Sequence, residues 1–378
     1  MARVAFARTD NSVLTQWWWS VDRWLFLGIS ILVAIGVMLV MAASPPVAER
    51  LGLDSFYFVK RHLVYVAGFF VVMVGVSQLS QKFTRRAALL LYLGALFLLI
   101  LIPFFGNEIK GARRWISVGG FSIQPSEFMK PALVVMTSWM LSEKKKNKDV
   151  PGNIFAIIFY GFAVGLLLLQ PDMGMIFLMT AIFFAQFFLA GLPLFLIVIA
   201  SATGIVGMVS AYFLFPHVQT RVDRFLTPST EDRFSERYQI TQSLEAFSSG
   251  GFWGLGPGEG IVKKHLPDAH ADFIFSVAGE EYGAFLCLII ALLFGFFVIR
   301  SVLKVMQEQN LFILLAVSGL ALEIGLQASI NMASTLDLIP TKGMTLPFMS
   351  FGGSSILSIA IACGFILALT RRQVHGRV

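Results

Sequence analysis

The sequence predicts an all-α integral membrane protein with about ten transmembrane helices. Hydrophobic residues make up 57% of its 378 residues and charged residues 13%, whereas charged residues make up about 25% of a typical soluble domain. Its 33 glycines fit this class, because glycine is more frequent in membrane helices than in soluble ones. Cys287 and Cys363 both lie inside apolar runs, so we expect small packed residues and no disulfide framework.

Ten apolar runs are long enough to cross roughly 30 Å of hydrocarbon at about 1.5 Å per helical residue. They cover residues 24–43, 62–79, 87–105, 126–142, 153–169, 172–190, 194–215, 273–298, 311–329 and 346–370. The first run exceeds the roughly 7–15 apolar residues of a signal peptide, so we expect it to remain as a span. The runs predict a single polytopic membrane domain over residues 1–378.

An even number of spans places both termini on one side of the membrane. The loops predicted on that side carry most of the basic residues: Arg3, Arg8, Arg23, Lys82, Arg85, Arg86, Lys144, Lys145, Lys146, Lys148, Arg300, Lys304, Arg371, Arg372 and Arg377. The positive-inside rule therefore predicts cytoplasmic termini. Basic residues that run against this trend are candidates for function: Arg50, Lys60, Arg61, Lys110, Arg113 and Arg114.

Residues 216–272 form a large extracytoplasmic loop between the predicted helices 7 and 8. Loops of this length are usually functional or disordered. Within it, residues 238–247 have the pattern of a short amphipathic helix, and residues 250–260 are rich in glycine. The glycine-rich stretch lacks the Lys-Ser/Thr pair of a nucleotide-binding P-loop. The net charge of +7 is spread along the loops, so nucleic acid is not an expected partner.

Charged residues also gather at the predicted outer ends of spans that are far apart in the sequence. They are Arg114, Glu127, Lys130, Asp172, Asp272, Glu280, Glu281 and Lys342. Glu127 and Asp172 have a structural alternative as helix caps, and Arg114 as an interfacial anchor. Asp272 stands out, because a carboxylate at the top of a hydrophobic helix is costly unless a neighbour uses or neutralises it.

The adjacent carboxylates Glu280 and Glu281 point about 100° apart on a helix, so both cannot face lipid cheaply. We expect at least one of them to face the bundle, toward Lys130, Arg114 or Lys342. Asp272 and Glu280 are expected to border one cavity.

His270 is a candidate base or ligand, but the chain has no His-x-x-x-His or Cys-x-x-Cys spacing, so no dedicated metal site is predicted. A loosely held Mg²⁺ or Mn²⁺ between Asp272 and a phosphate-bearing substrate stays open. The residues alone leave two classes of function. One is an enzyme with Asp272 as base and an anionic, lipid-linked substrate, and the other is a transporter with a charged path.

Ordered motifs along the chain resemble the SEDS family (shape, elongation, division and sporulation). They are Lys110–Ile116, Gln124–Glu127, Gln170–Asp172, Tyr238–Ser243, Leu266–Phe275, Gly279–Glu281 and Pro340–Ser355. The resemblance covers about residues 20–372 and is closer to the division branch than to the elongation branch. Ala271 stands where threonine is usual and Asp268 where glutamate is usual, and neither departure removes a charge.

The resemblance implies a peptidoglycan glycosyltransferase that polymerises lipid II at the outer face of the cytoplasmic (inner) membrane, at the division septum. It also implies a class B penicillin-binding protein and other divisome membrane proteins as partners. A lipid II flippase and a non-catalytic divisome scaffold are the alternatives.

Under the same resemblance, Asp272 matches the family's essential aspartate and is the expected general base. Arg114 and Lys342 are expected to stabilise charge that develops on the diphosphate. The full set of expected substrate-binding residues is Lys342, Arg114, Glu127, Lys130, Asp172, Glu281 and His270.

Overall fold

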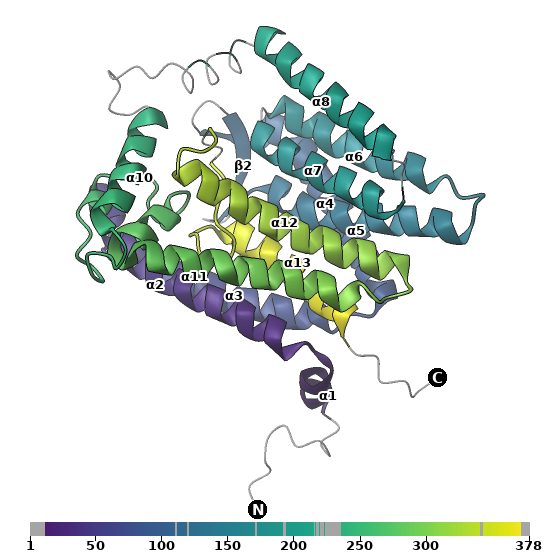
Figure 1. The fold of residues 1–378 in the computed structure, drawn as a ribbon, viewed down its shortest axis with the longest axis horizontal. Coiled ribbons are helices and arrows are strands. Elements are labelled where there is room, and N and C mark those ends of the chain that lie inside the picture. The colour runs from purple at the N-terminus through teal and green to yellow at the C-terminus, as the bar shows by residue number, and fades with distance from the viewer. Residues whose placement is uncertain are drawn as a thin grey trace, which may run out of the picture.

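The computed structural model is a bundle of long helices that run side by side (Figure 1). It describes residues 12–109, 112–118, 121–170, 172–191, 194–214, 216, 219, 223, 236–340 and 343–371. Its helices are α1 (Val13–Ser20), α2 (Arg23–Arg50), α3 (Tyr57–Ser77), α4 (Gln81–Phe105), α5 (Pro125–Lys146), α6 (Gly152–Leu169), α7 (Met173–Leu189), α8 (Leu194–Leu214), α10 (Glu236–Gly250), α11 (Ile274–Val305), α12 (Leu311–Thr335) and α13 (Gly353–Thr370). Its strands are β1 (Asn107–Ile109), β2 (Ala112–Val118) and β3 (Phe121–Ile123).

Each of the ten predicted runs overlaps a helix, so the predicted all-α membrane class is confirmed. Among the described residues, seven helices are long and apolar enough to cross a membrane by length and composition: α2, α3, α4, α6, α11, α12 and α13. The apolar helix α7 is shorter. In α5, the ionisable residues Glu127 and Lys130 interrupt the apolar run and are buried within the bundle.

The last predicted span, 346–370, begins too early. Helix α13 starts at Gly353, and residues 343–352 form an irregular segment instead. Pro347 and the Gly352-Gly353 pair both oppose a continuous helix. The segment passes deep into the bundle, because a Cβ placed on Gly36, in the middle of α2, would lie 2.6 Å from the carbonyl oxygen of Phe348. Irregular backbone at this depth is tolerated because protein surrounds it.

One end of the bundle carries α1 and the C-terminal end of α13, and we call it the terminal end (Figure 1). Long-range contacts define it: Arg300 of α11 bonds Asp22 before α2 over 3.0 Å, and Arg85 of α4 bonds Glu143 of α5 over 3.1 Å. The opposite end carries α10 and the strands, and we call it the sheet end. The basic residues at 82–86, 144–148 and 300–304 therefore lie at the same end as α1 and the end of α13, as the sequence predicts.

The loop after α4 folds into a small antiparallel sheet of order β1-β2-β3 that the sequence analysis did not predict. Glu108 of β1 pairs with Arg113 of β2, and Ile116 of β2 pairs with Ile123 of β3. Arg113 and Arg114 therefore lie on the central strand of the sheet, and this strand contacts both α4 and α5.

Helices α12 and α13 form the centre of the bundle. They are the most buried of the membrane spans, and α12 packs against α5, α7, α11 and α13. The peripheral α8 lies against α7 at one edge (Figure 1). Polar side chains on α12 are consequently enclosed by protein.

Helix α11 is broken toward the sheet end, at Gly283 (φ 73°, ψ −176°). The glycine-rich segment that follows α10 fills this break through backbone hydrogen bonds. Leu255 N–H donates to the Glu280 carbonyl over 2.9 Å, and Ala284 N–H donates to the Gly251 carbonyl over 2.9 Å. The predicted amphipathic helix in this loop is confirmed as α10, and the predicted glycine-rich turn has positive φ at Gly251, Gly254, Gly256 and Gly258.

Candidate active site

Asp272 is half-buried in the turn that leads into α11 at the sheet end. Two hydrogen bonds attach this turn to the irregular segment 343–352. Phe351 N–H donates to the His270 carbonyl over 2.9 Å, and the Ser350 hydroxyl donates to the Ala271 carbonyl over 2.6 Å. Asp268, where the turn begins, has φ 52°, a conformation that aspartate adopts more readily than most residues. The carboxylate is therefore carried on a turn that tertiary contacts fix.

Asn331 of α12 joins the same turn to the same segment. Its Nδ2 donates to the Asp272 carbonyl over 2.8 Å and to the Met344 carbonyl over 2.7 Å. The Asp272 carboxylate lies beside Gly343, since a Cβ placed there would be 3.6 Å from Oδ2. Lys342, the neighbour of Gly343, lies outside the described residues. Three segments distant in sequence thus meet at Asp272.

Lys130 lies one turn into α5 and is only 1% exposed. Its Nζ is 2.8 Å from Oε2 of Glu127 and donates to Oε1 of Gln327 over 2.6 Å. Gln327 in turn donates from Nε2 to the Thr345 carbonyl over 3.0 Å. A buried ammonium group is expected to be paired and hydrogen-bonded in this way, because desolvation of an unpaired charge is costly.

The two networks meet at residues 343–345. Lys130 reaches Thr345 through Gln327, and Asp272 reaches Met344 through Asn331. The structure therefore links the predicted residues Lys130 and Asp272, although through backbone carbonyls and not by direct side-chain contact.

Arg114 extends from β2 to the loop between α6 and α7. Its Nε donates to the Gln170 carbonyl over 3.2 Å, and its Nη1 is 3.8 Å from Oδ1 of Asp172. Asp172 also caps α7 by accepting the Met175 N–H over 3.4 Å. Burial raises the pKa of Asp172 above its usual value, and the charge of Arg114 offsets only part of that rise. Glu127 and Lys130 also act on the Asp172 charge, so all four residues form one electrostatic group.

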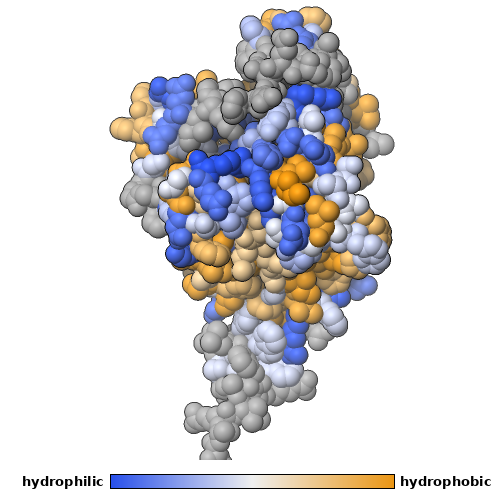
Figure 2. Space-filling view, turned by 90° about the vertical axis from the view of Figure 1, so that its left-hand side faces the viewer, coloured by the Kyte–Doolittle hydropathy of each residue, from blue (hydrophilic) through white to orange (hydrophobic). Residues whose placement is uncertain are grey.

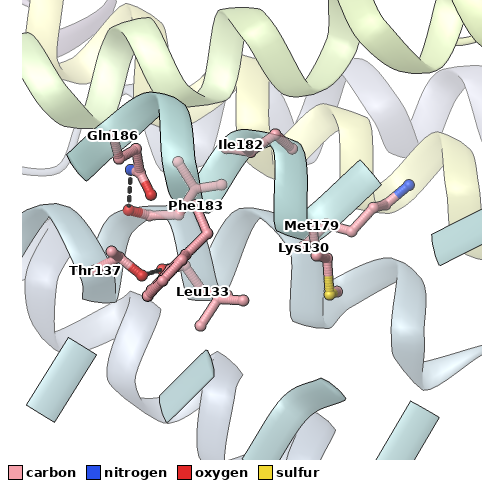
Figure 3. Close-up of a pocket in the computed structure, with 8 residues that line it drawn as sticks. Lys130, Leu133, Thr137, Met179, Ile182, Phe183 and Gln186 are labelled. Carbon is pink, nitrogen blue, oxygen red and sulfur yellow. Dashed lines mark hydrogen bonds between the residues drawn. The ribbon is translucent and has the colours of Figure 1, made fainter. Parts of the chain in front are cut away.

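A small cavity of about 10 Å³ lies between α5 and α7 beneath this group. Figure 3 shows Lys130 and Gln186 toward opposite ends of it. Gln186 donates from Nε2 to the Val134 carbonyl over 2.8 Å and to the Ser138 hydroxyl over 2.7 Å. A cavity of this volume holds about one water molecule. The space beneath Lys130 is therefore too small to admit a sugar or a lipid.

Glu280 and Glu281 are both buried, as expected of at least one of them, but the expected partners Lys130 and Arg114 were wrong. Glu281 is paired with Lys263 of the preceding loop, not with Lys130 or Arg114. Glu280 accepts the N–H groups of Val262 and Lys263 over 2.6 and 2.9 Å, at the start of the 3₁₀ turn η1 (Val262–Lys264). Both carboxylates bind the loop that follows α10 to α11, and this explains how each is buried without facing lipid.

His270 packs among aromatic rings, with its centroid 4.5 Å from that of Phe58 and 5.3 Å from that of Phe351. Burial lowers its pKa to about 4, so the imidazole is neutral near pH 7. The side chain shapes the turn that holds Asp272.

Sequence reasoning missed the polar face of α12. Glu323, Gln327 and Asn331 follow one another at intervals of four residues, and all three are buried. This spacing places them on one face of a helix, so a polar stripe at i, i+4 and i+8 in an apolar run was the available signal. The network between Lys130 and Asp272 depends on two of them.

The sheet end offers the chemistry of an anion-binding site with a base. Figure 2 shows this end of the molecule face-on, with hydrophilic residues gathered over its centre. Asp272 supplies a half-buried carboxylate, which can accept a proton. Arg114 supplies a planar cation suited to phosphate groups. Asn331 of α12 holds the backbone of Asp272, and the loop between α6 and α7 holds Arg114.

The chain is similar to known proteins over almost its whole length. Residues 22–375 match the model of the cell cycle protein family of FtsW, RodA and SpoVE. The chain is 46% identical over 370 residues to the probable peptidoglycan glycosyltransferase FtsW of Caulobacter vibrioides, covering 98% of this chain and 94% of that one. It is 36% identical over 357 residues to the protein of the same name from Trichlorobacter lovleyi, covering 92% and 93%.

The fold of the chain is also similar to solved structures. A chain of the structure described as "Structural coordination of polymerization and crosslinking by a peptidoglycan synthase complex" matches with a TM-score of 0.76 and 26% identity, covering 93% of this chain and 97% of that one. The crystal structure of the rod shape determining protein RodA of Thermus thermophilus matches with a TM-score of 0.65 and 25% identity over the same shares.

Proposed function

The chain belongs to the cell cycle protein family of FtsW, RodA and SpoVE, and we propose from this that it is a peptidoglycan glycosyltransferase of the FtsW kind. The observation that supports the proposal most directly is the position of Asp272. The backbone of the turn that carries this carboxylate is held by Asn331 and by Ser350 of segment 343–352. The turn lies at the end of the bundle that also carries Arg114.

The proposed reaction is a single displacement on lipid II. The 4-hydroxyl of an N-acetylglucosamine attacks the anomeric carbon of the growing chain, and a new glycosidic C–O bond forms. The bond from that carbon to the diphosphate breaks, and undecaprenyl diphosphate leaves with the bonding electrons. Asp272 takes the hydroxyl proton as general base. One displacement inverts an α-linked donor into a β-linked product, as in inverting glycosidases.

The remaining predicted residues take supporting roles in this proposal. Arg114 stabilises negative charge that develops on the diphosphate, and Lys342 is proposed for the same task. Glu127, Lys130 and Asp172 set the charge and position of Arg114 and of segment 343–352. His270 and Glu281 hold the outer loop against the bundle.

A divalent cation at this site stays a proposal. Among the described residues there is no group of three His, Cys, Asp or Glu that could hold a metal ion. A Mg²⁺ or Mn²⁺ ion would therefore need oxygen atoms of the substrate diphosphate beside Asp272. No step of the reaction is assigned to it.

The charge distribution and the relatives support the proposed membrane location and partners. Basic residues concentrate at the terminal end, which favours cytoplasmic termini and an outward sheet end in the inner membrane. The match to a chain of a peptidoglycan synthase complex supports a crosslinking partner, which we propose is a class B penicillin-binding protein. Further divisome membrane proteins and a septal location are proposed on the likeness to FtsW.

A reconstituted system tests this function against the flippase alternative. The full chain and its class B partner are placed in vesicles that contain fluorescent lipid II. Glycan polymer is resolved on gels, and translocation is followed by quenching of the outer-leaflet fluorophore. We expect polymer to form. Translocation without polymer would make the protein a flippase. If neither polymer nor translocation is detected, the result favours a non-catalytic scaffold.

A further inference from the structure

A groove at the terminal end lies far from Asp272 and takes no part in the proposed reaction. Its volume is about 500 Å³, and residues from α5, α6 and α7 line it. They are Leu141, Lys144, Lys145, Lys148, Asn153, Phe187, Ala190 and Gly191. A volume of this size is within the usual range of roughly 300–1,000 Å³ for small-molecule sites.

The groove combines an apolar floor with a cationic rim. Leu141 and Phe187 are buried and belong to the apolar cluster between α5, α7 and α12. Lys144, Lys145 and Lys148 are exposed. Lys145 reaches across to the loop after α7, since a Cβ on Gly191 would lie 3.7 Å from its Nζ.

The three rim lysines are not neutralised within the described part of the chain. No ion pair there joins Lys144, Lys145 or Lys148 to a carboxylate. Glu143, in the same helical turn, is engaged by Arg85 at 3.1 Å and lies 3.9 Å from Lys146, which does not line the groove. The rim therefore keeps a concentrated positive charge.

Lysines in the last turn of a helix also stabilise its dipole, but that role does not explain the whole arrangement. Lys148 lies beyond the end of α5, and Asn153 projects from the next helix. Both add polar groups to the same rim, between the end of α5 and the start of α6.

We propose that this groove binds the phosphate headgroup of an anionic phospholipid in the leaflet at the terminal end. The three ammonium groups and the Asn153 amide would hold the phosphodiester, and the first acyl carbons would lie on Leu141 and Phe187. Basic pockets between membrane helices on the cytoplasmic side are suited to such headgroups.

Native mass spectrometry of the full-length chain in detergent tests the site directly. Phosphatidylglycerol is titrated onto the protein, with phosphatidylcholine as the zwitterionic comparison. The variant Lys144→Gln, Lys145→Gln, Lys148→Gln should weaken phosphatidylglycerol binding about tenfold or more, since each lysine near a lipid surface contributes measurably to anion binding. The matched control Lys82→Gln, Arg86→Gln, Lys146→Gln removes three charges from the same end outside the groove, and it should change binding about twofold or less.

A second variant distinguishes the contribution of the groove's shape from that of its charges. Ala190→Phe fills the groove and keeps all three lysines, and it should also weaken phosphatidylglycerol binding. Equal losses in the rim and control variants, unchanged binding in Ala190→Phe, or equal retention of phosphatidylcholine would overturn the proposal. So would displacement of the lipid by millimolar inorganic phosphate, because the site would then be one for a soluble anion. The assay needs no turnover, so its failure is distinct from failure of the proposed reaction.

Discussion

The ammonium group of Lys130 lies 2.6 Å from Oε1 of Gln327, although 197 positions separate the two residues in the chain. This contact ties the outer part of α5 to the centre of α12. It also begins the hydrogen-bonded connection that ends at the backbone of Asp272. Lys130 and Asp272 are thus joined by one connected set of hydrogen bonds.

Lys130→Met is expected to destabilise the fold strongly. The change leaves Glu127 buried without its cation, which typically costs about 3–5 kcal/mol. The double variant Glu127→Gln, Lys130→Met should recover most of that loss. Lys60→Met is the matched control, because Lys60 pairs with Asp54 at the surface (72% and 58% exposed) and should cost less than about 1 kcal/mol. Unfolding midpoints in detergent measure all of these, and equal effects of the two lysine changes would contradict the buried-pair account.

Asn331→Ala is expected to slow lipid II polymerisation while the protein stays folded. The change removes the donor shared by the Asp272 and Met344 carbonyls, and a displacement of about 1 Å at a reacting group can lower the rate about 100-fold. The effect should fall mainly on kcat. Ser329→Ala on the same helix is the control, since its hydroxyl is exposed and bonds the Gly325 carbonyl. Polymerisation at wild-type rate by Asn331→Ala would remove this residue from the positioning of Asp272.

His270 is expected to make the fold sensitive to acid. Burial lowers its pKa to about 4, against about 6.5 in an unfolded chain. The unfolded state therefore binds the proton more readily, so stability from this residue is present above pH 6.5 and is lost as the pH falls toward 4. His270→Phe keeps an aromatic ring between Phe58 and Phe351 and should flatten the fall in unfolding temperature between pH 7 and pH 5. Parallel pH curves for the two proteins would rule His270 out as the source.

Gly283→Ala is expected to destabilise the break in α11 by more than about 1 kcal/mol. The residue has φ 73°, and an added Cβ would clash with the Phe252 carbonyl. Gly295→Ala on the same helix meets open space and should be neutral or stabilising, because alanine favours helix over glycine. Thermal unfolding of both variants measures the difference. Tolerance of alanine at position 283 would show that the break does not require glycine.

The fold was largely predictable because hydrophobic length determines where a chain can cross a membrane. Each predicted run met a helix, and α10 was foreseen from its amphipathic pattern. The start of α13 was not, since Pro347 and Gly352 act through local backbone geometry within an apolar run. The sheet at 107–123 was missed because its strands are only three to seven residues long.

The candidate site was predictable as a set of charges but not as a set of contacts. Arg114, Asp172, Glu127 and Lys130 do form one group. The partner of Glu281 was misassigned because Lys263 lies in a loop. A loop has no regular period from which the orientation of its side chains can be predicted. Gln327 was overlooked because the many apolar residues of α12 keep its mean hydropathy high despite the polar residues it contains.

The measurement that tests the central claim most directly is lipid II polymerisation by Asp272→Asn beside its matched control Asp268→Asn. Both changes remove one carboxylate from the same turn, and asparagine also accepts the positive φ at position 268. With each variant purified in complex with its class B partner, we predict that Asp272→Asn abolishes polymer while Asp268→Asn retains most of it. Polymer formation by Asp272→Asn at the wild-type rate would contradict the assignment of this carboxylate as the general base.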